Sequence, residues 1–165
     1  MRRCFQNFMY KCVRRFAWQA FCRATQEVQM LRPRVFGDMS RIVVHPTAQV
    51  NDALFNLSSG SVRVGPNAFF GHGVSVITGR HDPCATGAER RDSYPQEGCD
   101  VEIGEGAWIG SNATILGPCK IGRNSVVGAM CLVRSDVPEN VIVAGVPARV
   151  IKSLPINSPT EIPLS

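Results

Sequence analysis

IGEGAW-IGSNAT-ILGPCK-IGRNSV-VGAMCL, residues 103–132, places an aliphatic side chain at the first position of every group of six. A glycine follows that side chain in most of the groups, and a small residue stands four positions after it. Neither an α-helix, with 3.6 residues per turn, nor a β-strand, with two, gives a period of six. A solenoid with three short flat faces per coil does, because one inward side chain per face stacks on its counterparts in neighbouring coils.

The period of six also governs the sequence upstream. Two further runs of residues keep it: Val64, Phe70 and Val76, and, in a different phase, Val44 and Val50. Eighteen residues make one coil, so residues 44–81 and 101–137 predict about four coils. The small positions near the axis include Cys119 and Cys131, which we interpret as core residues rather than as reactive thiols.

Two breaks interrupt the repeat. Two extra residues, around Ser58–Ser61, lie between the upstream runs and predict a small bulge. The longer break, Asp82–Asp100, is rich in charge, glycine and proline, and it predicts a loop extruded at one corner of the solenoid. Because loops held by a rigid scaffold often carry binding and catalytic residues, we expect this corner to be functional.

Composition and charge limit the class of protein. A chain of 165 residues with 44% hydrophobic residues can bury the core of one domain. No apolar run reaches the roughly 18–20 residues of a membrane span, and seven irregularly spaced cysteines favour reduced thiols in the cytoplasm. Residues 1–34 have a net charge of +7 and the rest of the chain −2, so we expect no nucleic-acid partner for the body.

The basic N-terminal segment, residues 1–40, has a helical pattern over residues 5–20, with Phe5, Phe8 and Phe16 on one face. Two interpretations of this amphipathic helix stay open. Its apolar face caps the first coil, which would otherwise expose core and unpaired strand edges. Alternatively, residues 1–30 make peripheral contact with an anionic membrane at the inner face.

The sequence thus predicts an all-β solenoid of about four coils with an N-terminal amphipathic helix and one long extruded loop, residues 82–100. The solenoid domain is expected over residues 41–152, and Val141–Ile151 is expected to be a strand-like segment at its end. Residues 153–165, with three prolines, predict a loose tail.

Four motifs stand out beside the repeat: Thr78-Gly79-Arg80-His81-Asp82, Ala107-Trp108-Ile109-Gly110-Ser111, Asp136-Val137-Pro138 and Ala144-Gly145-Val146-Pro147-Ala148-Arg149-Val150-Ile151. Together they resemble the hexapeptide-repeat acyltransferases, most closely the galactoside/maltose and surface-polysaccharide O-acetyltransferases. The resemblance covers roughly residues 44–152. It implies a left-handed parallel β-helix and a homotrimer that binds an acyl-CoA, usually acetyl-CoA, in clefts between neighbouring subunits.

The resemblance also implies roles for particular residues. His81, where the repeat stops and the loop begins, matches the family's catalytic histidine and is expected to be the general base. Asn56 and His72 are the candidates for contact with the acceptor substrate. Cofactor contacts are expected from seven residues: Trp108, Ser111, Ala129, Arg134, Ser135, Arg149 and Lys152. The charges of Arg149 and Lys152 suit the phosphate groups of coenzyme A.

We therefore expect a cytoplasmic acetyl-CoA-dependent O-acetyltransferase that uses no metal and acts on a hydroxyl of a saccharide or glycan precursor. Two alternatives stay open: an N-acetyltransferase acting on an amino sugar or a xenobiotic, and a noncatalytic β-helix scaffold. A γ-type carbonic anhydrase shares the fold, but its zinc site would need three converging histidines, two of them five residues apart. This sequence has no histidine pair with that spacing.

Overall fold

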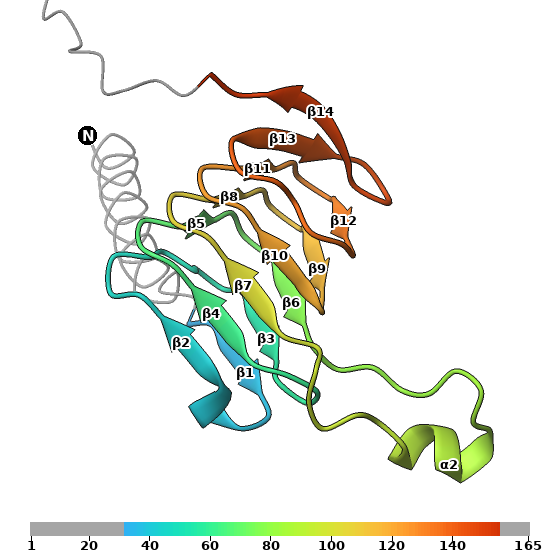
Figure 1. Ribbon diagram of the computed structural model, residues 1–165. Coiled ribbons are helices and arrows are strands. Elements are labelled where there is room, and N and C mark those ends of the chain that lie inside the picture. The colour runs from blue at the N-terminus through green and yellow to red at the C-terminus, as the bar shows by residue number, and fades with distance from the viewer. Residues whose placement is uncertain (1–31, 156–165) are drawn as a thin grey trace, which may run out of the picture. The chain divides into compact units, whose positions relative to one another are not determined.

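The computed structural model describes residues 32–155, which form short strands wound into a solenoid (Figure 1). The predicted helix over residues 5–20 and the tail from residue 156 onward lie outside the described residues. The capping and membrane interpretations of the N-terminal segment therefore stay predictions. Within residues 32–155, every helix is too short or too polar to cross a bilayer.

Three sheets form the faces of the solenoid. Sheet A contains β1 (Arg34–Phe36), β3 (Leu54–Asn56), β6 (Ser75–Ile77), β9 (Thr114–Leu116) and β12 (Leu132–Val133). Sheet B contains β2 (Ile42–Val44), β4 (Val62–Val64), β7 (Val101–Ile103) and β10 (Cys119–Ile121). Sheet C contains β5 (Phe69–Phe70), β8 (Trp108–Ile109), β11 (Val126–Val127), β13 (Val141–Ala144) and β14 (Arg149–Ser153). A 3-10 helix, η1 (Met39–Arg41), and a short helix, α2 (Gly87–Asp92), complete the described elements.

The chain visits sheets B, C and A in that order and then returns to sheet B one strand further along. Thus β4, β5 and β6 form one coil, and β7, β8 and β9 form the next (Figure 1). Strands pair in parallel with the same position of the neighbouring coil, as Phe55, Val76 and Ile115 do in sheet A. This stacking confirms the predicted parallel β-helix.

The residues of the repeat form the core. The aliphatic positions Val76, Ile109 and Ile115 and the small positions Ala68, Ala107 and Ala113 are all fully buried, and so is Phe55, which the predicted period of six did not include. Cys119 and Cys131 are buried among them, and burial raises the pKa of the Cys119 thiol to about 12. Their interpretation as core residues is confirmed. Val44, by contrast, is 36% exposed, because β2 is the outermost strand of sheet B among the described residues.

Glycine and asparagine allow the coils to turn and to approach one another. A Cβ atom at Gly110 would lie only 2.5 Å from the backbone nitrogen of Ala129 in the next coil, so Gly110 has no room for a side chain. Asn67, Asn124 and Asn140 lie where the chain turns from sheet B toward sheet C, and their φ angles are 56°, 53° and 54°. Asparagine tolerates this left-handed backbone better than most residues.

Both breaks in the repeat lie where the chain passes from sheet A to sheet B. Residues 57–61 join β3 to β4, and residues 78–100 join β6 to β7. Ser59 donates its backbone N–H to Thr78 Oγ1 (3.2 Å) and accepts the backbone N–H of Cys99 (3.0 Å). The bulge therefore holds both ends of the long loop, which projects from the solenoid and carries α2 (Figure 1). The sequence did not predict α2.

The two ends of the solenoid differ from the sequence-based expectation. β1 pairs with β3 in sheet A, although residues 34–36 were expected to belong to the N-terminal segment. The segment expected to be one strand over residues 141–151 is a hairpin, in which the chain reverses at Gly145 (φ 99°). β14 consequently lies antiparallel to β13, whereas the other strand pairs are parallel.

Candidate active site

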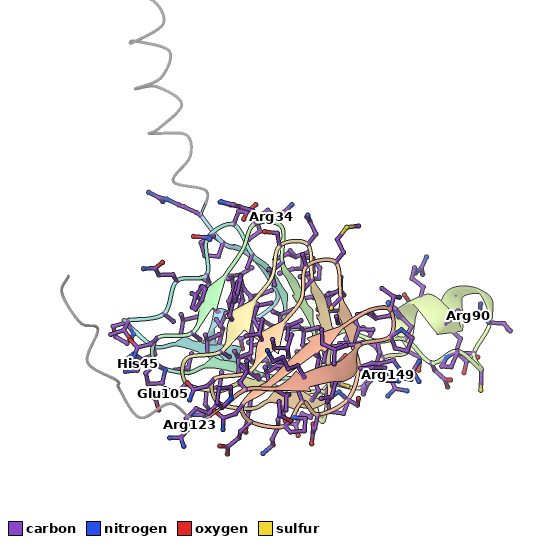
Figure 2. All side chains as sticks on the ribbon, turned by 90° about the horizontal axis from the view of Figure 1, so that it is seen from above. Arg34, His45, Arg90, Glu105, Arg123 and Arg149 are labelled. Atoms are coloured by element: carbon purple, nitrogen blue, oxygen red, sulfur yellow. The ribbon has the colours of Figure 1, made fainter. Side chains whose placement is uncertain are left out.

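The solenoid has three corners, which we name after the sheets that they join. Corner AB contains residues 37–41, 57–61, 78–100, 117–118 and 134–136; corner BC contains 45–48, 65–68, 104–107, 122–125 and 138–140; corner CA contains 51–53, 71–74, 110–113 and 128–131. Figure 2 separates them: His45, Glu105 and Arg123 gather at corner BC, whereas Arg149 lies on the side of the loop that carries Arg90.

His81 lies at corner AB, just after the chain leaves β6. Its imidazole is exposed, and its ring meets the ring of Tyr94 edge-on, with 5.9 Å between the centroids. The preceding Thr78 is buried, and its hydroxyl donates to the backbone oxygen of Asn56 (2.9 Å). The solenoid therefore fixes the start of the loop while it leaves the imidazole open to solvent.

The returning end of the loop is fixed as well. Asp100 Oδ1 accepts the backbone N–H and the hydroxyl of Ser61, both at 2.7 Å, and these two hydrogen bonds hold the pKa of Asp100 below its ordinary value. Arg41 donates from Nη1 to the backbone oxygen of Gln96 (2.7 Å). The loop that carries the predicted catalytic residue is thus tied to the solenoid at both ends.

Two hollows flank His81, and Arg80 and Tyr94 line both of them. The first, of about 410 Å³, lies against the solenoid, because Phe36 and Asn56 also line it. The second, of about 450 Å³, is bounded by residues of the loop itself. The first hollow is the better candidate for an acceptor site, because it joins aromatic, amide and imidazole groups from different elements.

Asn56, predicted from the sequence to contact the acceptor, thus lies in the same hollow as His81. Its Oδ1 accepts the backbone N–H of Ser58 at 3.0 Å, which orients the side-chain amide. Gly79 packs directly on that amide, since a Cβ atom at this position would lie 2.8 Å from Asn56 Oδ1. Asn56 is therefore an oriented polar group beside the imidazole.

His72 lies at corner CA, at the opposite end of β6 from the loop. Its Nδ1 is 3.2 Å from Oδ1 of Asp52, which also accepts the backbone N–H of Gly73 (3.0 Å). The Gly73 bond, more than the imidazole, holds the pKa of Asp52 below its ordinary value. The backbone N–H of His72 donates to Ser111 Oγ (3.2 Å). The structure thus groups His72 with Ser111 rather than with Asn56.

The three histidines occupy three different corners. His45 Nδ1 is 2.9 Å from Thr47 Oγ1, and His72 is paired with Asp52, whereas no hydrogen bond joins the ring of His81 to any of residues 32–155. In that part of the chain, no group of three or more His, Cys, Asp or Glu residues is arranged to hold a metal ion.

The predicted cofactor residues divide between corners. Ser111 and Ala129 lie at corner CA, one coil apart. Trp108 is 47% exposed on the outer face of sheet C, where its ring stacks on Phe69 with 5.7 Å between centroids and 17° between planes. Trp108 is therefore a partly exposed aromatic surface close in sequence to Ser111.

A second group of cofactor residues lies toward corner AB. Arg134, Ser135 and Arg149 line one hollow of about 170 Å³. Lys152 does not line it, although the strand that carries it is the same β14.

The register of β14 explains how Arg149 and Lys152 are related. In a regular strand, residues three apart point to opposite faces. Here Arg149 pairs with Ala144 and Lys152 pairs with Ile142, because a register shift inserts one extra residue into β14. Both basic residues therefore stand opposite positions on the same face of β13.

Corner CA and corner AB lie at opposite ends of the strands of sheet A: the chain enters each strand from corner CA and leaves it at corner AB. His72 and Ser111 precede β6 and β9, whereas His81 follows β6, so three-residue strands of about 10 Å plus the turns separate the two groups. One chain therefore does not bring His81 to Ser111 or Ala129.

Of the residues that line the hollow beside His81, only Asn56 and His81 were identified from the sequence as site residues, and three of the others have large side chains: Phe36, Arg80 and Tyr94. Arg80 belongs to the recognised motif, and its position beside the predicted base was the available signal. Phe36 comes from β1, which was assigned to the N-terminal segment, and Tyr94 comes from the far side of the loop. Neither has a repeat position that could have revealed its place.

Comparison with known proteins defines the class. Residues 100–135 match the family model described as bacterial transferase hexapeptide (six repeats). The chain therefore carries the hexapeptide repeat of the bacterial transferases, wound as a parallel β-helix, and the resemblance predicted from its motifs is confirmed.

The curated relatives that the chain resembles include acetyltransferases. The chain is 36% identical over 126 residues to serine acetyltransferase 2 of Arabidopsis thaliana, covering 76% of this chain and 36% of that protein. It is also 36% identical over 110 residues to the putative lipopolysaccharide biosynthesis O-acetyl transferase WbbJ of Escherichia coli, covering 63% and 56%. The chain thus spans less than two thirds of the length of these relatives.

Solved structures agree with this class. A maltose O-acetyltransferase from Clostridium difficile 630 superimposes with a TM-score of 0.62 at 27% identity, covering 75% of this chain and 67% of that one. The hexapeptide-repeat acetyltransferase VCA0836 from Vibrio cholerae, crystallised with acetyl-CoA, shares the fold (TM-score 0.53, 24% identity, coverage 83% and 78%). Since relatives and structural neighbours are acetyltransferases, they support the prediction of an acyltransferase.

Proposed function

We propose that this protein is an acetyl-CoA-dependent O-acetyltransferase that acetylates a hydroxyl of a saccharide or glycan precursor. One observation carries the assignment: the exposed ring of His81 borders two hollows, and in one of them it stands beside the oriented amide of Asn56. A general base must have a free lone pair at a place where substrate can enter.

The proposed reaction needs one base and two positioned substrates. The unprotonated imidazole nitrogen of His81 takes the proton of the acceptor hydroxyl as the oxygen attacks the thioester carbonyl carbon. The new C–O bond forms, the C–S bond breaks, and the proton passes from His81 to the departing thiolate of coenzyme A. Asn56, oriented by Ser58, is a suitable hydrogen-bonding partner for the acceptor.

For the donor, we propose that Ser111, Ala129 and Trp108 border the pantetheine arm. Arg134, Ser135, Arg149 and Lys152 would lie toward the nucleotide. The hollow shared by Arg134, Ser135 and Arg149 supports a phosphate site there, since guanidinium groups bind phosphate through paired, charge-assisted hydrogen bonds.

We infer a homotrimer from the separation of the two corners. If His81 acts on a thioester that Ser111 and Ala129 border, corner AB of one chain must meet corner CA of a neighbouring chain. A cyclic trimer places corner AB of each subunit against corner CA of the next, so every site contains residues of two chains.

The cytoplasm is the proposed location. Cys84, Cys99, Cys119 and Cys131 are all free thiols, which is typical of a reducing compartment. Contact of residues 1–30 with an anionic membrane stays a prediction.

The direct test is the release of free thiol from acetyl-CoA in the presence of neutral, acidic and amino saccharides. His81→Ala should lower turnover with the best acceptor by about 10²–10⁴-fold, the usual contribution of a general base. His45→Ala, at corner BC, is the matched control and should keep full turnover. An inactive His72→Ala beside a nearly normal His81→Ala would refute the assignment of the base, and exclusive use of amino acceptors would favour N-acetylation.

A further inference from the structure

The chemistry of the acceptor can be narrowed from the arginines around the long loop. Three of the four are engaged by other groups. Arg41 donates to the backbone oxygen of Gln96 (2.7 Å), and Arg90 donates to two backbone oxygens of the loop (2.6 and 3.2 Å). Arg91 makes a two-bond pair with the carboxylate of Asp92 (2.7 and 2.9 Å). Arg41 and Arg90 thus tie parts of the loop in place, and Arg91 is paired with its neighbour in the chain.

Arg80 is the fourth, and it differs from the others. It is exposed, it lines both hollows that flank His81, and no hydrogen bond or ion pair joins it to any of residues 32–155. Asp82, two positions further along, accepts the backbone N–H of Cys84 (2.8 Å) within its own turn. The guanidinium of Arg80 is thus a cation available to a ligand, directly beside the proposed base.

The hollow of about 410 Å³ has a lining that suits a sugar ring with a negative group. Arg80 is the one permanently charged side chain among the described residues that line it. Phe36 and Tyr94, which are 65% and 41% exposed, offer apolar ring surfaces at its rim. Asn56 adds the oriented amide.

We propose that the acceptor is an acidic saccharide whose carboxylate or phosphate binds Arg80 while a ring hydroxyl meets His81. The proposal rests on the proposed function and specifies its acceptor. Arginine presents a planar fork of N–H donors that matches either anionic group, so the shared feature is a negatively charged oxygen pair. The sugar ring lies between Phe36 and Tyr94.

The phosphates of coenzyme A are a less suitable partner for Arg80. The hollow that contains Arg134 and Arg149 lies beside β12, and β9 separates β12 from β6, the strand that Arg80 follows. Two strand spacings amount to about 10 Å along the solenoid. Arg80 therefore lies near the acceptor end of the site, and the phosphates of the donor are expected to bind Arg134 and Arg149.

The test compares matched methyl glycosides that share one ring, differ at carbon 6 and all lack a free 6-hydroxyl: a neutral methyl 6-deoxyhexoside, the corresponding methyl hexuronide and the corresponding methyl hexoside 6-phosphate. Thiol release from acetyl-CoA gives kcat/KM for each acceptor with the full-length wild-type protein, Arg80→Gln and Arg80→Lys. Arg63→Gln, an exposed arginine on sheet B, is the matched control. The two acidic acceptors distinguish a carboxylate from a phosphate as the natural group.

We expect the preferred acidic acceptor to exceed its neutral counterpart by at least about tenfold in kcat/KM, roughly the effect of one charge-assisted contact. Arg80→Gln should remove that preference, Arg80→Lys should restore part of it, and Arg63→Gln should leave it unchanged. An equal loss for neutral and acidic acceptors in Arg80→Gln, or a preference for the neutral acceptor, overturns the proposal and leaves the O-acetyltransferase assignment standing.

Measuring the binding of acidic saccharides without acetyl transfer separates the proposal about Arg80 from the proposed acetyltransferase activity. Titration of the hexuronide and the hexoside 6-phosphate, followed by NMR in the absence of acetyl-CoA, should show binding that Arg80→Gln weakens about tenfold or more. If neither acid binds the wild-type protein, the proposal about Arg80 is wrong whatever the transfer assay gives. If acid binding depends on Arg80 but no acceptor ever releases thiol, the proposed acetyl transfer is wrong and the acidic-saccharide site stands.

Discussion

At the scale of single residues, Asp100 shows how the solenoid controls the functional loop. Its carboxylate receives two hydrogen bonds from Ser61, and these bonds favour the charged form and lower its pKa. Because the folded-state pKa lies below the ordinary value of 3.8, Asp100 stabilises the folded protein above pH 3.8. That contribution disappears as the pH falls through the lowered pKa.

Asp100→Asn should therefore lower the melting temperature at pH 7 by a few degrees, because it replaces charge-assisted hydrogen bonds by neutral ones. The difference from the wild type should shrink as the pH is lowered from 5 toward 3, which thermal unfolding at a series of pH values would measure. Ser61→Ala, which removes one of the two donors, should give a smaller loss. A difference between wild type and Asp100→Asn that is constant with pH would contradict this account.

At the scale of elements, the spacing between coils is set by glycines that follow the inward aliphatic residue. Gly110 and Gly128 occupy the same position of the repeat, but their surroundings differ. A Cβ atom at Gly110 would lie 2.5 Å from the backbone nitrogen of Ala129, whereas one at Gly128 would meet its nearest neighbour, Val143 O, at 3.2 Å. The backbone at Gly110 has to move to accept a methyl group, and at Gly128 a few tenths of an ångström suffice.

Gly110→Ala should consequently destabilise the folded protein by about 1–3 kcal/mol, the usual cost of overpacking. In a chain of this size, that corresponds to a fall in melting temperature of about 2–4 °C per kcal/mol. Gly128→Ala is the matched control and should cost clearly less. Circular dichroism melts of the two variants make the comparison, and equal losses would show that the close approach of the coils at Gly110 is not the cause.

Elements of this fold could be predicted from the sequence wherever the repeat fixes the position of a residue. The buried positions of Val76, Ile109 and Ile115 follow from the period of six, because every coil imposes the same inward direction. The partner of His72, by contrast, is Asp52, 20 residues away, and neither residue has a repeat position that specifies the pair.

The candidate site could be predicted in part for the same reason. His81 was identified because it stands where the repeat stops, within a recognised motif. The walls of its hollow come from β1 and from the returning side of the loop, and their place depends on contacts such as that of Arg41 with Gln96, 55 residues away. No local pattern encodes contacts of that range.

At the scale of the whole molecule, the proposed reaction requires residues from corner AB and from corner CA, which a single chain keeps apart. His81 belongs to corner AB and Ala129 to corner CA, so each site in a trimer would combine one chain's base with the next chain's cofactor residues. An exposed alanine such as Ala129 can be replaced by a bulky residue that blocks the cofactor while it leaves His81 intact.

Co-expressed His81→Ala and Ala129→Trp chains should therefore restore activity that neither variant has alone. With random assembly of equal amounts, about a quarter of the sites contain an intact residue from each chain, so about a quarter of wild-type turnover is expected. Mixing His81→Ala with His81→Asn is the control and should restore nothing. Sedimentation of a fully active 18.0 kDa monomer, or the absence of any recovery in the mixed trimers, would exclude shared sites.

The reversed strand at the end of sheet C has a consequence for growth of the solenoid. Coils that stack in parallel register resemble the rungs of a fibril, and an open final rung is a template on which another copy can continue the ladder. β14 covers that rung in sheet C with a strand that runs in the opposite direction and carries Arg149 and Lys152. An incoming chain meets a mismatched, positively charged edge, so the hairpin that contributes to the proposed phosphate site also works against end-to-end polymerisation.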